Sequence, residues 1–299
     1  MSGNDRKPVE IPEVAGPVPH PRKPRLALPR GSVDCHAHVF GPYDRFPLTL
    51  PRSYSPPEAS LEQYRAMLTL MGFDRGVLVQ PSVHGSDNRS MVDALKRDPQ
   101  RLRGIAVVDP SVSEAELDAL DAAGVRGLRI NVLFAGGTDL AATEKLAARI
   151  APRGWHIQLL VDVGTMPDFG IRFGSFPCPV VVDHMGHVGP SEAASAPGFS
   201  GLLTLLDTGK AWVKLSGAYR VTEKGSPFAD VAAVARDLIA ANPTRGVFAT
   251  DWPHPALKWP MPDDGDLVDL LADWEPDEAR RRAILIDNPQ RLYGFDTWS

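Results

Sequence analysis

The fold of this 299-residue chain is decided by one stretch, Val33-Asp34-Cys35-His36-Ala37-His38-Val39-Phe40. It is an apolar, partly β-branched run that carries two histidines two positions apart. Side chains at positions i and i+2 of a strand point to the same face, so we expect a strand that aims both imidazoles at one point. Because two buried polar rings need partners, the pair indicates a functional site at the end of this strand.

Seven further apolar runs follow, with helix-period segments between them. Residues 61–71 repeat apolar positions at helical spacing, and Ser113 with Glu116 forms a capping box before another helix. Continuous apolar runs are typical of parallel strands covered on both faces, and no G-x-G-x-x-G motif supports an open doubly wound sheet instead. Eight strand-helix units predict a (β/α)8 TIM-like barrel, whose active site lies at the C-terminal ends of the strands. The runs are 33–40, 76–80, 104–108, 127–132, 156–161, 180–184, 211–216 and 246–250.

Proline is in excess, with 29 residues, of which seven lie in residues 1–30. That stretch has no apolar period of 2 or 3.6, so we predict a polyproline-like, poorly ordered N-terminal arm over 1–30, with a disordered leader as the alternative. Residues 31–299 then form a single barrel domain. Ten more prolines fall in three loops at predicted C-terminal strand ends, where fixed φ angles favour a pre-formed rim.

Composition excludes several classes of protein. The balance of 32 basic and 37 acidic residues gives a net charge of −5, which offers no broad cationic surface for nucleic acid or anionic lipid. No apolar run approaches the roughly 18 residues of a membrane span, and the N-terminus lacks a secretory pattern. The chain has two cysteines, Cys35 and Cys178, which we expect to be reduced. The sequence therefore predicts a cytoplasmic protein without membrane or nucleic-acid partners.

Histidines gather where the active site of a barrel is expected. His36 and His38 can converge on one small ligand, either a metal ion or a substrate carbonyl. Asp251 ends the eighth run, a position typical of a catalytic residue, and would act as general base toward water; an N-cap of the next turn is the alternative. Six of the eight histidines lie at or just after a predicted strand end: His36, His38, His84, His184, His187 and His254.

Arginines and hydroxyls complete the predicted site. Arg129 and Arg220 lie at or after the fourth and seventh runs, where they could bind a carboxylate or sulfonate in bidentate fashion. An internal ion pair with an acidic residue of the barrel is the alternative. The further substrate-binding candidates lie in loops after the first, second and eighth runs: Tyr54, Ser82, His84 and His254.

Five segments resemble the amidohydrolase superfamily, specifically the lactonase branch typified by the 2-pyrone-4,6-dicarboxylate hydrolases. The resemblance runs from about residue 31 to 295 and implies a TIM-like barrel that hydrolyses a lactone ester in aromatic catabolism. It further implies Asp251 as the base for water, three histidines around the carbonyl oxygen (His36, His38 and His184), and Arg129 and Arg220 on substrate carboxylates. The segments are Val33–Pro42, Gln80–Asn88, Val182–Gly186, Thr250–Pro255 and Asp287–Tyr293.

Two positions depart from that branch. Ala135 and Leu160 stand where the pyrone dicarboxylate hydrolases carry an arginine and a tyrosine. The expected partner is therefore a small acidic lactone, either pyrone-dicarboxylate-like or muconolactone-like. A 4-sulfomuconolactone hydrolase, a sugar-acid lactonase or isomerase, and a non-catalytic organic-acid binding barrel are the alternatives. The sequence leaves open whether the chain forms a homo-oligomer.

We expect no metal cofactor, with zinc as the alternative. Mononuclear members of the superfamily add a histidine at the end of the fifth strand, whereas here His156 stands at the start of that run. The bridging lysine of binuclear members has no counterpart at the end of the fourth run. If zinc is bound, as in a zinc-dependent decarboxylase or amidohydrolase, the candidate ligands are His36, His38, His184 and Asp251.

Overall fold

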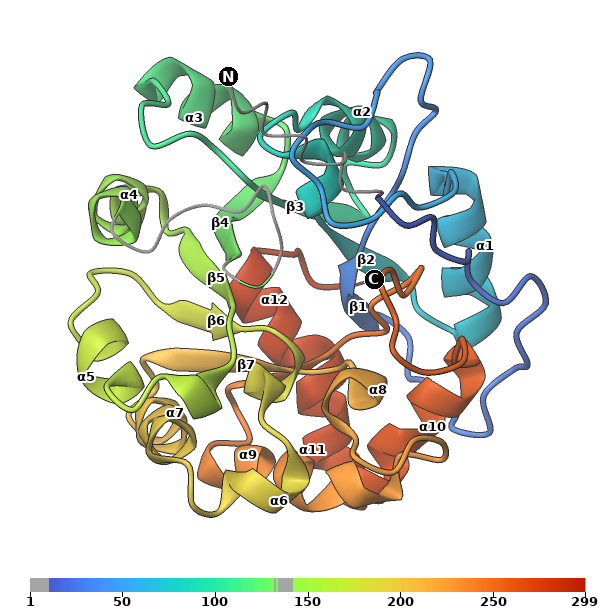
Figure 1. Ribbon diagram of the computed structural model, residues 1–299, viewed down its shortest axis with the longest axis vertical. Helices are drawn as coiled ribbons and strands as arrows, with labels where there is room; N and C mark the ends of the chain where they lie inside the picture. Colours follow the sequence, from blue (N-terminus) through green and yellow to red (C-terminus); the bar gives the residue numbers. More distant parts are fainter. Residues whose placement is uncertain (1–10, 132, 134–141, 299) are drawn as a thin grey trace, which may run out of the picture.

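Eight parallel strands curl into a barrel surrounded by helices (Figure 1). The structure is a computed structural model that describes residues 11–131, 133 and 142–298. Each strand pairs in parallel with the next in sequence order. The strands are β1 Val33–Ala37, β2 Arg75–Val79, β3 Leu102–Ala106, β4 Val125–Asn131, β5 His156–Leu160, β6 Val180–Val182, β7 Ala211–Leu215 and β8 Gly246–Phe248.

Backbone hydrogen bonds close the barrel between β1 and the residues that follow β8. The Asp251 amide donates to the His36 carbonyl at 2.9 Å, and the His38 amide donates to the Trp252 carbonyl at 2.8 Å. These bonds place the His-x-His segment directly beside Asp251. The predicted (β/α)8 barrel is thereby confirmed.

Helices alternate with the strands and pack around the barrel (Figure 1). The helix expected over 61–71 is present, and Ser113 and Glu116 form the expected capping box, each side chain accepting from the other's amide. In the described part of the chain, no helix is both long and apolar enough to cross a bilayer. The helices are α1 Leu61–Met71, α2 Arg89–Arg97, α3 Glu114–Ala122, α4 Thr143–Ile150, α5 Phe169–Gly174, α6 Pro190–Ala193, α7 Pro197–Asp207, α8 Ala218–Val221, α9 Ala232–Ala241, α10 Asp264–Trp274, α11 Glu278–Arg282 and α12 Asn288–Tyr293.

Apolar packing fills both the shell and the interior of the barrel. One cluster lies between strands and helices, and a second lies inside the barrel, where Cys35 and Val77 meet Tyr293 of α12 and Phe295. Tyr293 also contacts the ring of His156 at the start of β5, so α12 closes the N-terminal end of the barrel. This leaves the C-terminal strand ends for the site.

The described part of the N-terminal segment is held against the barrel. The Val14 amide donates to the Ser55 carbonyl at 3.0 Å, and the Ser55 amide donates to the Pro12 carbonyl at 2.8 Å. Further along, the Leu26 amide donates to the Asp269 carboxylate of α10 at 2.8 Å. This differs from the poorly ordered arm that composition predicts, because backbone amides between the prolines find acceptors on the barrel.

Candidate active site

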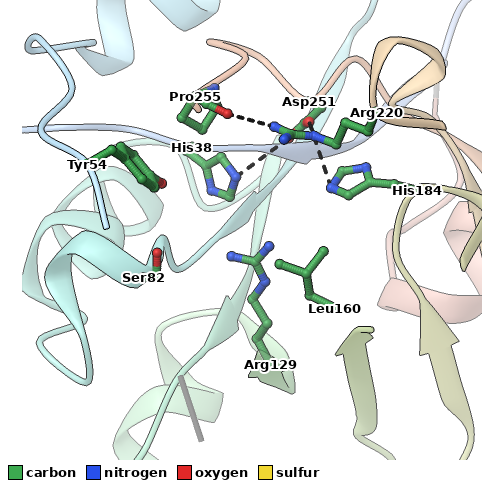
Figure 2. A pocket seen from close by; sticks show the side chains of 9 residues that line it. All are labelled: His38, Tyr54, Ser82, Arg129, Leu160, His184, Arg220, Asp251 and Pro255. Atoms are coloured by element: carbon green, nitrogen blue, oxygen red, sulfur yellow. Dashed lines mark hydrogen bonds and ion pairs between the residues drawn. The ribbon is translucent and has the colours of Figure 1, made fainter. Parts of the chain in front are cut away.

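A pocket lies at the C-terminal ends of the strands (Figure 2), where the sequence places the active site. It encloses about 10 Å³, which is room for one water molecule. Except for Leu160 and Pro255, its lining consists of site residues predicted from the sequence. The lining residues are His38, Tyr54, Ser82, Arg129, Leu160, His184, Arg220, Asp251 and Pro255.

His36 and His38 converge as their spacing predicts, with their Nε2 atoms 3.3 Å apart. His38 reaches the pocket wall and His36 lies outside that wall. The His38 Nδ1 atom lies 2.7 Å from the Val79 carbonyl oxygen, which can only accept, so Nδ1 carries the hydrogen and Nε2 is bare. Burial lowers the pKa of His36 to about 3 and also lowers that of His38, so both rings are neutral. The hydrogen between the two Nε2 atoms therefore belongs to His36.

Asp251 has a left-handed backbone, with φ 67°, a conformation that aspartate tolerates better than most residues. Its Oδ2 accepts from the Tyr219 hydroxyl at 2.6 Å and from Arg220 Nε at 2.7 Å. Its Oδ1 has no hydrogen-bond partner among the described residues and lies 3.7 Å and 3.6 Å from Nε2 of His36 and His38. Burial opposes ionisation, but the Arg220 guanidinium holds the pKa of Asp251 well below its ordinary value. The site therefore contains a carboxylate with one bare oxygen.

His184 lies on the other side of Asp251. Its Nε2 lies 3.7 Å from Asp251 Oδ2, and its Nδ1 lies 2.9 Å from the Ser216 hydroxyl. Gly217, with φ 63°, packs directly on this ring, and a Cβ at that position would lie 3.0 Å from the His184 side chain. The glycine therefore leaves the space that His184 needs to reach Asp251.

The two pocket arginines, Arg129 and Arg220, differ in how many of their guanidinium donors are bonded to other residues. Arg129 donates to the Gln80 carbonyl through Nη1 at 3.1 Å, and its Nε has no hydrogen-bond partner among the described residues. Figure 2 shows its guanidinium pointing into the pocket. Arg220 pairs more closely, with Asp251 Oδ2 at 2.7 Å, and donates to the Pro255 carbonyl at 3.0 Å. Arg129 Nε lies 3.6 Å from Asp183 Oδ2, so both arginines make the internal ion pair that the sequence left as an alternative. Arg129 is thus the cation more available to a ligand.

A second layer of polar groups lies close to the pocket, inside the barrel. Lys214 of β7 is fully buried, and its Nζ lies 2.7 Å from Gln158 Oε1 and 3.3 Å from His36 Nδ1. Gln158 Nε2 donates to Asp183 Oδ2 at 3.1 Å. Sequence reasoning missed Lys214, although a lysine inside the apolar run Trp212-Val213-Lys214-Leu215 is a signal that could have found it.

Positive charge exceeds negative charge in and beside the pocket. Among the described residues there, three side chains are cationic, namely Arg129, Arg220 and Lys214, and two are anionic, Asp183 and Asp251. All five are at most 10% exposed. A cleft with an excess of one positive charge favours an anionic ligand.

His254 and His84 do not reach the pocket wall. His254 is fully buried, with Nδ1 3.1 Å from the Tyr219 hydroxyl and Nε2 3.0 Å from Asp264 Oδ1. Both ring nitrogens are occupied, which differs from the predicted role in substrate binding. His84 Nδ1 lies 3.2 Å from the Pro47 carbonyl oxygen. Tyr219 of α8 was also missed, since a single tyrosine after a strand carries no distinguishing sequence pattern.

Of the other residues singled out in the sequence, three line the pocket and one lies outside the described residues. Tyr54 and Ser82 line the pocket and hydrogen-bond to each other. Leu160 also lines it, so the pocket is apolar where the branch carries a tyrosine. Ala135 lies outside the described residues.

The fold and the site together define an enzyme of the (β/α)8 barrel class. The chain belongs to the amidohydrolase family, whose profile matches residues 33–295. It is 39% identical to a 2-pyrone-4,6-dicarboxylate hydrolase of Comamonas testosteroni, over 92% of this chain and 93% of the relative. It is 35% identical to a 4-sulfomuconolactone hydrolase of Hydrogenophaga intermedia, over 96% of each chain. A probable 2-pyrone-4,6-dicarboxylic acid hydrolase of Acinetobacter baumannii, solved with citric acid bound, is 27% identical with a TM-score of 0.78, over 89% of this chain and 100% of that one.

Zinc occurs on this fold, and the chain contains a His/His/Asp group. A Burkholderia multivorans amidohydrolase with bound zinc has a TM-score of 0.68 at 18% identity, over 89% of this chain and 99% of that one. Here ligand atoms of His36, His184 and Asp251 lie within 4.8 Å of one another. A metal ion needs a bare nitrogen from each histidine, but Nε2 of His36 carries the hydrogen shared with His38, and Arg220 occupies Asp251 Oδ2. As arranged, the donor set does not fit a divalent ion.

Proposed function

We propose that this protein hydrolyses the ester bond of a small anionic lactone without a metal ion. The observation that carries the proposal is the ionised Asp251, which lines a pocket with an excess of positive charge and whose Oδ1 has no hydrogen-bond partner among the described residues. The relatives named as lactone hydrolases support this reaction class. The citric acid bound to the Acinetobacter protein supports an acidic ligand.

The substrate carries one anionic group on Arg129. Of the two pocket arginines, Arg220 donates to both Asp251 and Pro255, whereas Arg129 donates to Gln80 and makes only a longer ion pair, at 3.6 Å, with Asp183. Leu160 adds apolar wall where a second polar anchor would stand. A muconolactone-like ring whose only anionic group is one carboxylate therefore suits the described residues better than a dicarboxylate does.

Hydrolysis begins with a water molecule beside Asp251. Asp251 lines the pocket, and its Oδ1 accepts one proton of the water while the water oxygen attacks the lactone carbonyl carbon. Tyr219 and Arg220 hold Oδ2, so the orientation of Oδ1 is fixed before the substrate enters. General-base catalysis of this kind contributes about 10²- to 10⁴-fold in rate.

The oxyanion of the tetrahedral intermediate, formed when water adds to the lactone carbonyl, then needs hydrogen-bond donors. Asp251 Oδ2, 3.7 Å from His184 Nε2, can only accept, so we assign the ring hydrogen to Nε2, and Nδ1 accepts from the Ser216 hydroxyl. His184 Nε2 then donates to the oxyanion. His38 Nε2 is bare and cannot donate, which reduces the three histidines expected at the carbonyl oxygen to one. Collapse of the intermediate breaks the ring C–O bond, and the proton on Asp251 returns to the leaving oxygen.

Asp251→Asn tests the proposal most directly. The amide keeps the shape and the hydrogen bonds of the carboxylate but cannot take a proton from water. We expect kcat to fall by about 10²- to 10⁴-fold, with product affinity within a few-fold, measured by ring-opening assays and calorimetry. Unchanged turnover would overturn the role of Asp251.

A lactone panel tests the substrate class. It contains pyrone dicarboxylate, muconolactones with a carboxylate or a sulfonate, and an uncharged aldonolactone, each assayed with and without a chelator. We expect turnover of singly charged rings that persists in chelator. Loss of activity in chelator with recovery on adding zinc would support the zinc-dependent alternative, and binding without ring opening would support a non-catalytic barrel.

A further inference from the structure

Lys214 is a charged amine in an unusual place. It lies in the middle of β7, is fully buried, and points into the barrel toward His36. A buried lysine requires acceptors, and Lys214 has Gln158 Oε1 at 2.7 Å, His36 Nδ1 at 3.3 Å and Asp183 Oδ1 at 3.5 Å. The proposed hydrolysis does not use it.

Two groups compete for Nδ1 of His36. Lys214 Nζ lies 3.3 Å away in hydrogen-bonding geometry. Asp183 Oδ1 lies 3.2 Å away and is the acceptor that competes for a hydrogen on this nitrogen. An ammonium group donates and cannot accept, so the Lys214 contact requires a bare Nδ1 and places the ring hydrogen on Nε2.

The opposite side of the ring leads independently to the same tautomer. His38 donates through Nδ1 to the Val79 carbonyl, which leaves its Nε2 bare. The 3.3 Å contact between the Nε2 atoms of the two histidines then needs a hydrogen from His36. The bonds from Lys214 at one end and to His38 at the other therefore require one and the same tautomer of His36.

We propose that Lys214 is a positioning residue that locks His36 in the Nε2–H tautomer and thereby makes the His-x-His pair a hydrogen-bonded pair rather than a metal site. Without Lys214, the hydrogen moves to Nδ1 and is donated to Asp183, as in the carboxylate-histidine pairs that support metal ligands. Both Nε2 atoms are then bare beside Asp251 Oδ1. Their separations of 3.3, 3.6 and 3.7 Å are close to the roughly 3.4 Å between neighbouring ligands of tetrahedral zinc.

The inference rests on the proposed function in one respect, that the site works without a metal, but its test uses neither substrate nor turnover. The first measurement is the ¹⁵N spectrum of the histidine rings in wild-type protein, assigned with His36→Gln. We expect the protonated nitrogen of His36 to be Nε2. A protonated Nδ1 would overturn the inference even if lactone hydrolysis is confirmed.

The second measurement is zinc affinity of Lys214→Met, determined by competition with a chromophoric chelator. Partners behind a ligating histidine change metal affinity by about 10- to 100-fold, so we expect one zinc to bind at least tenfold tighter than to wild type. Equal affinity of the two proteins would overturn the inference. Lys214→Gln replaces Lys214→Met if the latter does not fold, as judged by circular dichroism.

A matched control separates the tautomer from simple charge removal. Arg129→Met also removes one buried cation near Asp183, from which Arg129 Nε lies 3.6 Å away, but it leaves the Lys214 contact with His36 intact. We expect zinc affinity of Arg129→Met to stay within threefold of wild type. An equal gain in both variants would show that net charge, and not the tautomer, keeps zinc out, and would overturn the proposal.

Discussion

At the scale of single residues, Asp251 divides its two carboxylate oxygens between two tasks. Oδ2 accepts from Tyr219 and Arg220, whereas Oδ1 has no hydrogen-bond partner among the described residues. Because Tyr219 also contacts His254, which contacts Asp264, a buried chain of hydrogen bonds fixes the carboxylate from behind. Orientation of the base is thus supported by Tyr219, His254 and Asp264, which lie outside the pocket wall.

Tyr219→Phe should lower kcat and leave KM nearly unchanged, because it removes one of two donors to Oδ2 without altering the pocket wall. A hydrogen bond to a charged group is worth about 1.5–3 kcal/mol, so we expect a fall in kcat of about 10- to 100-fold. Steady-state kinetics on the best substrate of the lactone panel measures it. Tyr43→Phe is the matched control, because Tyr43 donates only to loop carbonyls at Pro56 and Pro57, and a similar loss in that variant would contradict the argument.

Gly217→Ala should damage activity by displacing His184. The new Cβ would lie 3.0 Å from that ring, and φ is 63°, so we expect about 1–2 kcal/mol of lost stability from the backbone and a clear loss of kcat. Gly154→Ala provides the comparison, because φ is 69° there and no heavy atom lies within 4 Å of the added Cβ. Denaturant unfolding should show similar losses in both variants, whereas activity should fall only in Gly217→Ala.

Residues could be predicted from the sequence where a rule connects residue type to strand position. His36 and His38 follow from strand alternation, and Asp251 from its place after the eighth strand. Lys214 could not be assigned a role in this way, because its partner Gln158 lies 56 positions away on another strand. Such a contact depends on barrel closure and leaves no local pattern.

At the scale of elements, apolar runs locate strand starts better than strand ends. Each predicted run begins within two residues of an observed strand, but the run 180–184 continues past β6, which ends at Val182, and the run 246–250 continues past β8, which ends at Phe248. The extra residues stay buried after the last ladder bond and lead into His184 and Asp251. Burial pattern therefore does not distinguish the end of a strand from the beginning of the site.

Asp269 of α10 makes several contacts with the N-terminal segment. Asp269 Oδ1 accepts from the amides of Arg25 and Leu26 at 2.8 Å, and Oδ2 pairs with Arg22 and Arg25. Asp269→Ala leaves two amides unpaired, so we expect a loss of about 1–3 kcal/mol in unfolding free energy and rapid tryptic cleavage after Arg22 and Arg25, followed by mass spectrometry.

Asp266→Ala is the control for this segment. Asp266 is 60% exposed and pairs only with the Arg22 side chain, so its removal should cost less than about 1 kcal/mol and leave the segment resistant to trypsin. Equal protease sensitivity of the two variants would mean that surface ion pairs, and not the buried amide contacts, hold the segment.

At the scale of the whole molecule, the barrel buries one histidine, His156, at the end opposite the candidate active site. His156 begins β5 at the end that α12 closes, is 1% exposed, and neither ring nitrogen has a hydrogen-bond partner among the described residues. Its ring meets Tyr293 edge-on at 5.5 Å. Burial, and then the charge of Lys214, lower the pKa of His156 to about 3, so the folded protein holds it neutral.

This histidine should make folding stability depend on pH. Its pKa is lower in the folded chain than the ordinary 6.5, so the unfolded chain binds the proton more readily, and stability is lost as pH falls below 6.5. Between pH 7 and pH 4 the loss due to this group is about 3 kcal/mol. We therefore expect His156→Gln to lose less stability than wild type over that range by about this amount, measured by urea unfolding at each pH. His20→Gln, which changes an exposed histidine, should show the same pH dependence of stability as wild type. If stability fell equally with pH in wild type and His156→Gln, the folded barrel would protonate His156 as easily as the unfolded chain does.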